Sequence, residues 1–395
     1  MPESQTKFFY QGVIPGSKSL FNRILIVKSY FPDLNISGES SCDDVRFMRE
    51  GIKQINVVSD IDCGEGGTTL RFMALRVSRQ PGEHILRGTT RLMQRPQKGL
   101  LDLLHQLGVQ AEFKGNELHI SSEGWKKPQQ ALQLQLSESS QYASALLLNS
   151  WLLDFDFDFE LVGEKLSESY FALTLELVKN LGMKVEQKGS HFHVAAGETI
   201  SQFSYEVESD LSSTFTIAAA GALAGESRIQ NFPIHSKQPD KAFLDVFKKM
   251  QVETEFKERT LRVCESPSLK SVDYNLGESP DLFPVLAILC SFANGTSRLH
   301  GAPHLVSKES NRIAKVSELL NLVGVKHESL PDGMIIHGQP QQALKTGLQF
   351  NPDQDHRMVM AASLLKLRGH GIHIHEPEAI NKSFPEFWSI IGVKP

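Results

Sequence analysis

Polar clusters alternate with almost wholly apolar runs along this chain, at steps of about seventy residues. A helix that is apolar on all sides belongs in a protein core, so runs such as YASALLLNSWLL and LFPVLAILCSFANG predict buried helices. Self-similarity at a fixed period indicates a repeat architecture, here with six units. The six polar clusters begin at Pro15, Glu65, Ser137, Ser209, Ser279 and Asp355.

A second, amphipathic helix is predicted in these units. The segments from Pro96 and Leu173 carry apolar residues at i, i+3, i+4 and i+7, so one helix face should contact the core. Several of these segments end alike, as in HQLGV and NLVGV, where glycine occupies the position of a left-handed residue that ends a helix. Short alternating segments such as LHIS and HFHVAA predict strands. The expected unit is strand, buried helix, strand, amphipathic helix, then one or two strands.

The length of 395 residues exceeds what one ordinary core supports and favours two domains of three units each. No long Gly/Ser or Pro linker divides the chain, so the crossings between domains should be short. We expect one domain over residues 14–207 and the other from residues 1–13 plus 208–395. The first repeat interval, from Ser19 to Thr68, is 49 residues against 72 for each of the next two, so the first unit is shortened.

Composition narrows the class of protein. A net charge of −5 and a pI near 6.3 argue against a general nucleic-acid binder. The 4 cysteines are scattered without CxxC spacing, which is typical of reduced thiols in a cytosolic protein. The N-terminal residues do not resemble a signal peptide, and the longest apolar runs are too short to span a bilayer. We expect a cytoplasmic monomer without a membrane or nucleic-acid partner.

The first polar cluster has the residue types of an anion site. Lys18 and Ser19 follow a Pro-Gly-Ser turn, and Arg23 lies one helical turn after Ser19 on the same side. A hydroxyl, an ammonium and a guanidinium would bind a phosphate or carboxylate. The alternative is an ordinary serine N-cap with lysine and arginine side chains that reach to solvent. The spacing is not that of a Walker A loop.

The next two clusters offer similar groups. Gly67 belongs to a Gly-Gly turn that lets backbone amides approach a ligand, although such a turn before a helix is common. Arg91 and Arg95 lie four residues apart before a proline and would suit a dianion or a solvated surface. Ser139, Ser140 and Gln141 place three polar side chains at the start of a helix, where a cap needs only one.

The C-terminal half adds acids to the cations. Asp281 opens one apolar helix, and Glu309 lies between two cations that are i,i+4 apart. If the buried helices are parallel, their starts converge around a ligand with several negative charges, and these two acids are then placed for proton transfer. We find no metal-ligand spacing, dinucleotide fingerprint or Ser-His-Asp arrangement, so no metal or cofactor is expected. The cations in question are Lys18, Arg23, Arg91, Lys308, Arg312, Arg357 and Lys382.

These motifs, in this order, resemble the 5-enolpyruvylshikimate-3-phosphate (EPSP) synthases, the enolpyruvyl transferases of the shikimate pathway. The likeness runs from PGSKSLFNR through GGTTLR, TTRLMQRP, SSQ, SESY, SPD, SKESNR and DHRM to INKSFPEF. It implies a mixed α/β fold, a two-domain inside-out α/β barrel with three βαβαββ units per domain around buried parallel helices, closing on the substrates. It also implies transfer of the enolpyruvyl group of phosphoenolpyruvate to the 5-hydroxyl of shikimate-3-phosphate, with release of phosphate and without a cofactor.

The resemblance also implies a role for each matched residue. Asp281 is implied to orient the hydroxyl, Glu309 to donate the methylene proton and Lys18 to assist it. The phosphoenolpyruvate site is implied to comprise Lys18, Gly67, Arg91, Gln141, Arg312, Arg357 and Lys382. The shikimate-3-phosphate site is implied to comprise Ser19, Arg23, Ser139, Ser140, Ser167, Tyr170, Asp281 and Lys308.

The chain departs from the family pattern at Glu65, Phe72, His304 and Val306, where Asn, Pro, Asn and Arg are frequent. A carboxylate at position 65 should repel the phosphate of phosphoenolpyruvate unless a neighbouring cation pairs with it. Two other functions stay open on the residues. One is an enolpyruvyl transferase for a UDP-amino sugar, for which neither Cys63 nor Cys42 matches the reactive cysteine. The other is a non-catalytic or altered-substrate protein that binds anions.

Overall fold

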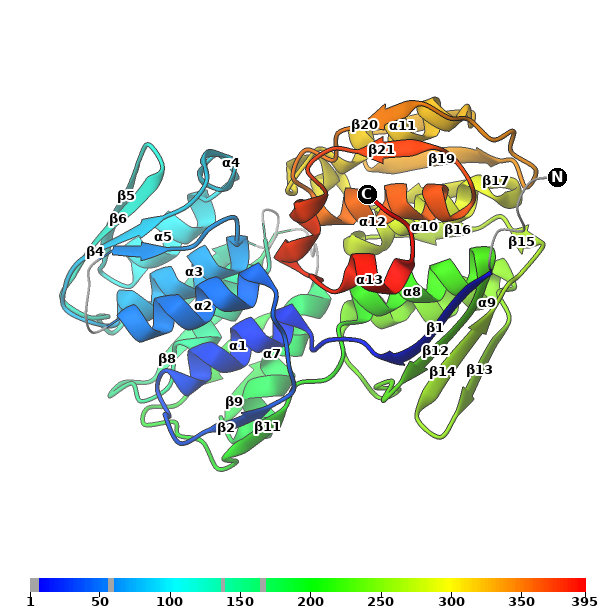
Figure 1. Cartoon of the computed structure of the whole chain (residues 1–395). Coiled ribbons are helices and arrows are strands. Elements are labelled where there is room, and N and C mark those ends of the chain that lie inside the picture. The colour runs from blue at the N-terminus through cyan, green and yellow to red at the C-terminus, as the bar shows by residue number, and fades with distance from the viewer. Residues whose placement is uncertain (1–6, 56–59, 136–138, 164–167) are drawn as a thin grey trace. The chain divides into compact units, whose positions relative to one another are not determined.

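The computed structural model describes residues 7–55, 60–135, 139–163 and 168–395. By its internal contacts the chain forms two compact units. Unit 2 is Gly16–Val207, and unit 1 combines the chain up to Pro15 with Glu208–Pro395 (Figure 1). Within the described residues, no helix combines the length and apolar character needed to cross a membrane.

Unit 2 alternates helices and strands. Its sheets have the orders β3-β4-β6-β5, β7-β8-β10-β9 and β11-β2. Its elements are α1 (Lys18–Lys28), β2 (Asn35–Ser37), α2 (Asp43–Gln54), β3 (Asp60–Asp62), α3 (Gly67–Val77), β4 (Gly82–Arg87), α4 (Thr90–Met93), α5 (Lys98–Gln106), β5 (Gln110–Lys114), β6 (Glu117–Ser122), β7 (Leu132–Gln135), α6 (Gln141–Leu148), β8 (Phe157–Val162), α7 (Glu168–Leu181), β9 (Val185–Lys188), β10 (His191–Val194) and β11 (Ser204–Glu206).

Unit 1 repeats this order. Its sheets have the orders β1-β12-β14-β13, β15-β17-β19-β18 with β16 also beside β17, and β20-β21. Its elements are β1 (Phe8–Val13), α8 (Leu211–Ala224), β12 (Gly225–Gln230), η1 (Pro239–Ala242), α9 (Phe243–Met250), β13 (Thr254–Lys257), β14 (Thr260–Cys264), β15 (Leu269–Lys270), β16 (Asp273–Asn275), η2 (Pro280–Leu282), α10 (Phe283–Ser291), β17 (Ala293–His300), η3 (Pro303–Ser307), α11 (Arg312–Val323), β18 (His327–Leu330), β19 (Gly333–Gly338), β20 (Leu348–Phe350), α12 (His356–Leu367), β21 (Ile372–Ile374), η4 (Pro377–Lys382) and α13 (Phe387–Ile391).

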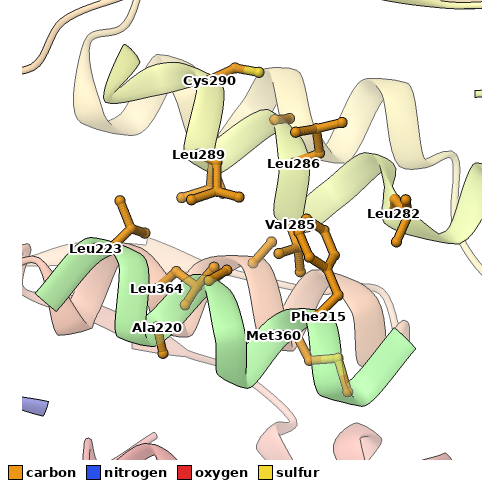
Figure 2. Close-up of a cluster of buried hydrophobic side chains, with 14 of the residues drawn as sticks. Phe215, Ala220, Leu223, Leu282, Val285, Leu286, Leu289, Cys290, Met360 and Leu364 are labelled. Atoms are coloured by element: carbon orange, nitrogen blue, oxygen red, sulfur yellow. The ribbon is translucent and has the colours of Figure 1, made fainter. Parts of the chain in front are cut away.

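The six apolar runs form the buried helices that the sequence predicts. In unit 2, α1, α3 and α6 pack on one another; in unit 1, α8, α10 and α12 do the same. Every residue of α10 is buried, as its all-round apolar sequence requires. Figure 2 shows the shared core of unit 1, where Phe215 of α8, Val285 and Leu289 of α10, and Met360 and Leu364 of α12 lie together. The predicted mixed α/β fold with helices inside the units is confirmed.

Parallel strand pairs flank the buried helices. β3 pairs with β4 across α3, β7 with β8 across α6, and β20 with β21 across α12. The strand paired with β2 after α1 is β11, from the far end of unit 2. β1, which directly precedes α1 in the sequence, instead pairs with β12 of unit 1, with Phe8 opposite Gly225. The chain therefore passes between the units at two places.

The amphipathic helices end as the sequence predicts. Gly108, Gly182, Gly324 and Gly392, which follow α5, α7, α11 and α13, have φ between +73° and +115°, and Gln251 after α9 has φ of +57°. A residue without Cβ adopts this conformation without a steric penalty, which explains the glycines. An antiparallel hairpin then follows α5, α7, α9 and α11. Among the described residues, the element that follows α2 is β3 rather than a hairpin, in keeping with the short first interval.

Candidate active site

The starts of the buried helices in unit 2 carry several of the predicted residues. Lys18, the first residue of α1, forms an ion pair with Asp44 in the first turn of α2, with 3.0 Å between Nζ and Oδ2. Ser19 is half-buried beside it. Because Asp44 is also largely buried, the pair fixes the position of the Lys18 ammonium at the helix start. Sequence reasoning did not find Asp44, which lies 26 residues from Lys18.

Arg23 lies one turn further along α1 and is fully enclosed. Its Nε donates to Thr174 Oγ1 at 2.7 Å, Nη1 to the Ser19 carbonyl at 2.8 Å and Nη2 to the Tyr170 carbonyl at 3.1 Å. Burial lowers the pKa of Arg23 to about 10, so the guanidinium still carries its charge at neutral pH. Its guanidinium also lies over the ring of Phe72, 5.5 Å from the centroid.

Arg71 of α3 contacts Gln141, the first residue of α6. Its Nη1 donates to Gln141 Oε1 at 2.8 Å, its Nε donates to Gln97 Oε1 at 3.1 Å, and the guanidinium lies 5.2 Å from the ring centroid of Tyr142. Gln141 in turn donates to Thr68 Oγ1 at 3.1 Å. The predicted Gln141 is therefore held in place by Arg71, to which the sequence analysis assigns no role.

Gly67 begins α3 beside two guanidinium groups. A Cβ at this position would lie 3.0 Å from Arg95 Nη1 and 3.6 Å from Arg71 Nη1, so glycine leaves these cations their present places. Arg91 lies on the four-residue helix α4 with an exposed side chain, whereas Arg95 is half-buried. The phosphoenolpyruvate role of Arg91 stays a prediction, and the placement favours Arg95 for a group bound at Gly67.

The serines expected near the substrate phosphate lie at the start of α6. Ser139 Oγ accepts from the backbone N–H of Gln141 at 3.2 Å and from Arg71 Nη1 at 3.4 Å. Ser140 is buried at the N-cap position. Tyr170 is half-buried in the first turn of α7. Ser167 lies outside the described residues.

Arg312 organises the candidate site of unit 1. It is 1% exposed at the start of α11 and contacts three carboxylates. Nη1 is 2.7 Å from Asp281 Oδ1, Nη2 is 3.0 Å from Glu309 Oε2, and Nε is 2.8 Å from Asp355 Oδ2. Asp355 also caps α12 by accepting from the Arg357 backbone N–H at 2.9 Å. Two predicted acids and one predicted cation thus form a single buried network.

Asp281 is surrounded by cations at the start of α10. Besides Arg312, Lys308 Nζ lies 3.9 Å from Oδ1 and Arg357 Nη2 lies 3.6 Å from Oδ2. Burial alone would raise the pKa of Asp281, but Lys308, Arg312 and Arg357 together lower that pKa well below its usual range. Asp281 is therefore an ionised hydrogen-bond acceptor throughout the physiological pH range.

Glu309 and Lys382 complete the predicted set in unit 1. Lys382 is buried at the end of η4, and its Nζ lies 3.7 Å from Glu309 Oε1. Glu309 thus contacts a guanidinium through one oxygen and an ammonium through the other. Sequence reasoning did not find Asp240, which accepts from Ser212 Oγ and whose pKa burial raises to about 7, with Asp281 adding to the rise.

His304 lies in the same region as an uncharged imidazole. Neither ring nitrogen has a hydrogen-bond partner among the described residues, and both are shielded from solvent. Burial, and then the nearby Lys308, lower the pKa of His304 to about 3. Val306 is exposed. Among the described residues no group of three or more His, Cys, Asp or Glu could hold a metal ion.

The family model and the curated relatives that match this chain are named for the same activity. A family model described as EPSP synthase (3-phosphoshikimate 1-carboxyvinyltransferase) matches residues 33–391. The chain belongs to the EPSP synthase family. A 3-phosphoshikimate 1-carboxyvinyltransferase of Syntrophobacter fumaroxidans is 30% identical over 95% of this chain and 94% of the relative. One of Methanocaldococcus jannaschii is 33% identical over 84% of this chain and 78% of the relative.

Solved structures of the same fold agree with this assignment. An EPSP synthase of Acinetobacter baumannii superposes with a TM-score of 0.74, at 20% identity and over 98% of this chain and 95% of that one. An enolpyruvyl transferase of Streptomyces tendae gives a TM-score of 0.74 at 12% identity, over 98% of this chain and 95% of that one. At these identities the likeness concerns the fold. The family of transferases that the sequence motifs indicated is confirmed by the family model and the relatives.

Proposed function

We propose that this chain transfers the enolpyruvyl group of phosphoenolpyruvate to the 5-hydroxyl of shikimate-3-phosphate and releases phosphate, as a step of the shikimate pathway. Family membership supports the reaction, and the buried Arg312 network with its two differently held acids, Asp281 and Glu309, is the observation that carries it. We expect a monomeric enzyme of the cytoplasm that needs no cofactor.

We assign binding of the substrate anions largely to unit 2. Arg23 and Ser19 would receive the carboxylate of shikimate-3-phosphate, since Arg23 is held by three neutral oxygens and keeps its charge. Ser139 and Ser140 would contact its phosphate, together with Ser167 and Tyr170. Lys18, Gly67, Gln141 and Arg95 would hold phosphoenolpyruvate, with Arg71 positioning Gln141.

We assign the bond-making groups to unit 1. Glu309, in its protonated form, would give a proton to the methylene carbon of phosphoenolpyruvate and become a carboxylate between Arg312 and Lys382, which makes the neighbouring carbon electrophilic. The 5-hydroxyl then attacks that carbon while Asp281, kept ionised by its cations, accepts the hydroxyl hydrogen bond and takes the proton. Phosphate leaves from the tetrahedral intermediate, and loss of a methyl proton restores the double bond. Arg312, Arg357 and Lys382 would stabilise the negative charge on Glu309 and on the leaving phosphate, and Lys308 would assist Asp281.

The test is phosphate release by the purified full-length protein given both substrates, with Glu309→Gln as the variant. Glu318→Gln is the matched control, because Glu318 lies on α11, shortly after Glu309 in the sequence, with a partly exposed side chain paired to Lys315. We expect release that requires both substrates and falls by about 10²–10⁴ in Glu309→Gln. Undiminished release in Glu309→Gln would overturn its role as proton donor.

A protein that binds anions without catalysis is the second candidate. The uncharged, unpartnered His304 beside Lys308 and the half-buried Glu65 are the observations that favour it. Binding of shikimate-3-phosphate without phosphate release would support it, and would point to a damaged phosphoenolpyruvate site around Glu65. Absence of both binding and release would mean that the fold serves another anion.

A further inference from the structure

A cavity of about 410 Å³ opens in unit 2, away from the helix starts described above. It lies between the C-terminal ends of α1 and α3 and the second half of α2, three helices that lie side by side in Figure 1. α1 runs from Lys18 at the candidate site to Lys28 at the cavity. At 1.5 Å per helical residue, the cavity therefore lies about 15 Å from the candidate site. Its volume falls within the range of roughly 300–1,000 Å³ for small-molecule sites.

The walls of this cavity are largely apolar. Leu25, Pro32, Ile52 and Ile55 contribute aliphatic surface. Leu25 and Ile55 are largely buried, and Ile52 is half-buried on α2. A surface of this kind favours the body of an organic molecule over a hydrated inorganic ion.

Four cations line the same cavity, and no acid does: Lys28, Arg49, Lys53 and Arg76. The contacts of three of them are to neutral oxygens. Lys28 Nζ donates to the Leu34 carbonyl at 2.6 Å, Arg49 Nη1 to the Ser40 carbonyl at 3.3 Å, and Arg76 Nε to Ser29 Oγ at 2.7 Å. Within residues 7–55, 60–135, 139–163 and 168–395, no carboxylate lies within 4.0 Å of any of the four.

Helix ends account for only part of this charge. Lys28, Lys53 and Arg76 lie in the last turns of α1, α2 and α3, where cations complement the helix dipole. Each of the three helix ends carries roughly half a negative charge, so a total of about 1.5 negative charges faces the four positive side chains. Arg49 lies before the last turn of α2 and has no such explanation. A net positive potential therefore faces an apolar cavity.

We propose that this cavity binds a small organic carboxylate with an apolar body. The aliphatic walls would take the hydrocarbon part, and Arg49 and Lys53 would take the carboxylate. Lys28 and Arg76, which already hold the chain between α1 and β2, would add to the positive potential. The site is independent of the proposed transferase reaction, because none of the residues assigned to the substrates lines it.

The test is calorimetric titration of the full-length protein with 2-naphthoate and with the uncharged 2-naphthamide, which has nearly the same shape. We expect 2-naphthoate to bind at least about tenfold more tightly than the amide. Arg49→Gln and Lys53→Gln should each weaken 2-naphthoate about three- to tenfold and leave the amide unchanged. Lys188→Gln, which changes an exposed lysine on β9 of the same unit, should bind both as the wild type does.

Three results would overturn the proposal: no binding of 2-naphthoate, equal binding of acid and amide, or wild-type binding in both variants. Displacement of 2-naphthoate by phosphoenolpyruvate, with wild-type affinity in the variants, would place the ligand at the helix starts instead. Lys53 is on the surface of α2, so Lys53→Gln keeps the test valid should Arg49→Gln fold poorly. Phosphate release is not part of the readout, so failure here and failure of the transferase proposal are distinguishable.

Discussion

Replacement of Arg312 by methionine removes the buried charge that holds three carboxyl groups together. Methionine has a similar length and no donor, so Asp281, Glu309 and Asp355 each lose a contact of 3.0 Å or less. Lys308, Arg357 and Lys382 stay in place but lie 3.6–3.9 Å from their acids. Asp355 is then left fully buried without its guanidinium partner, whereas Asp281 and Glu309 are partly exposed and keep only these more distant cations.

Removal of one partner from a buried ion pair costs about 3–5 kcal/mol. A domain of this size loses roughly 2–4 °C in Tm per kcal/mol, so we expect a decrease of about 6–20 °C at neutral pH. The pH dependence has a definite sign. In the wild type, Asp281 has a lowered pKa, so its stabilising effect is present above the unfolded pKa of about 3.9 and is lost as the pH falls further.

In the variant Asp281 lacks its nearest cation, so the pKa of this carboxyl in the folded state rises. Once that pKa exceeds the unfolded value, the variant is destabilised more as the pH increases and the carboxyl ionises. The difference in Tm between the two proteins should therefore be smaller at pH 5 than at pH 8. Scanning calorimetry across this range measures it, with Arg298→Met as control because Arg298 is exposed on β17. A Tm equal to that of the wild type, or a difference that does not change with pH, would refute the reasoning.

Three further changes test other parts of the structure. Thr174→Val takes the acceptor from Arg23 Nε and should raise the KM for shikimate-3-phosphate about tenfold without changing that for phosphoenolpyruvate, whereas Thr174→Ser should keep both. Glu65→Asn should lower the KM for phosphoenolpyruvate by removing a repelling charge; an unchanged KM would mean that the carboxylate points away from the phosphate. A thiol reagent at pH 8 should modify the partly exposed Cys264 first, because burial raises the pKa of Cys42 to about 11. Rapid labelling of two or more thiols in the folded protein would contradict this order.

The buried helices could be predicted because their signal lies in contiguous residues. α10 is apolar over its whole length, and any packing that exposed one of its sides would be unfavourable. The ends of the amphipathic helices were predictable for the same reason, since the left-handed residue follows directly in the sequence. Gln251 shows that glycine is favoured there but not required.

The partners within the candidate site could not be predicted in this way. Lys18 and Asp44 are 26 residues apart, Arg312 and Asp355 are 43 apart, and Arg71 and Gln141 are 70 apart. Their contacts follow from how separate helices and strands pack, which no single stretch of sequence specifies.

The proposal of Arg95 in place of Arg91 also rests on the structure and not on the sequence. A spacing of four suggests one helix face, but α4 ends at Met93, so Arg95 lies beyond the helix.

The pairing of β1 with β12 sets the order in which the chain can fold during synthesis. Phe8 leaves the ribosome long before its partner Gly225, by roughly 10–40 s at 5–20 residues per second. Unit 2 is continuous and can fold in that interval, with β11 supplying the strand beside β2. During this time β1 has no strand to pair with, so it is accessible to chaperones. A fragment that ends near Val207 should therefore fold as unit 2 with a loose leading segment.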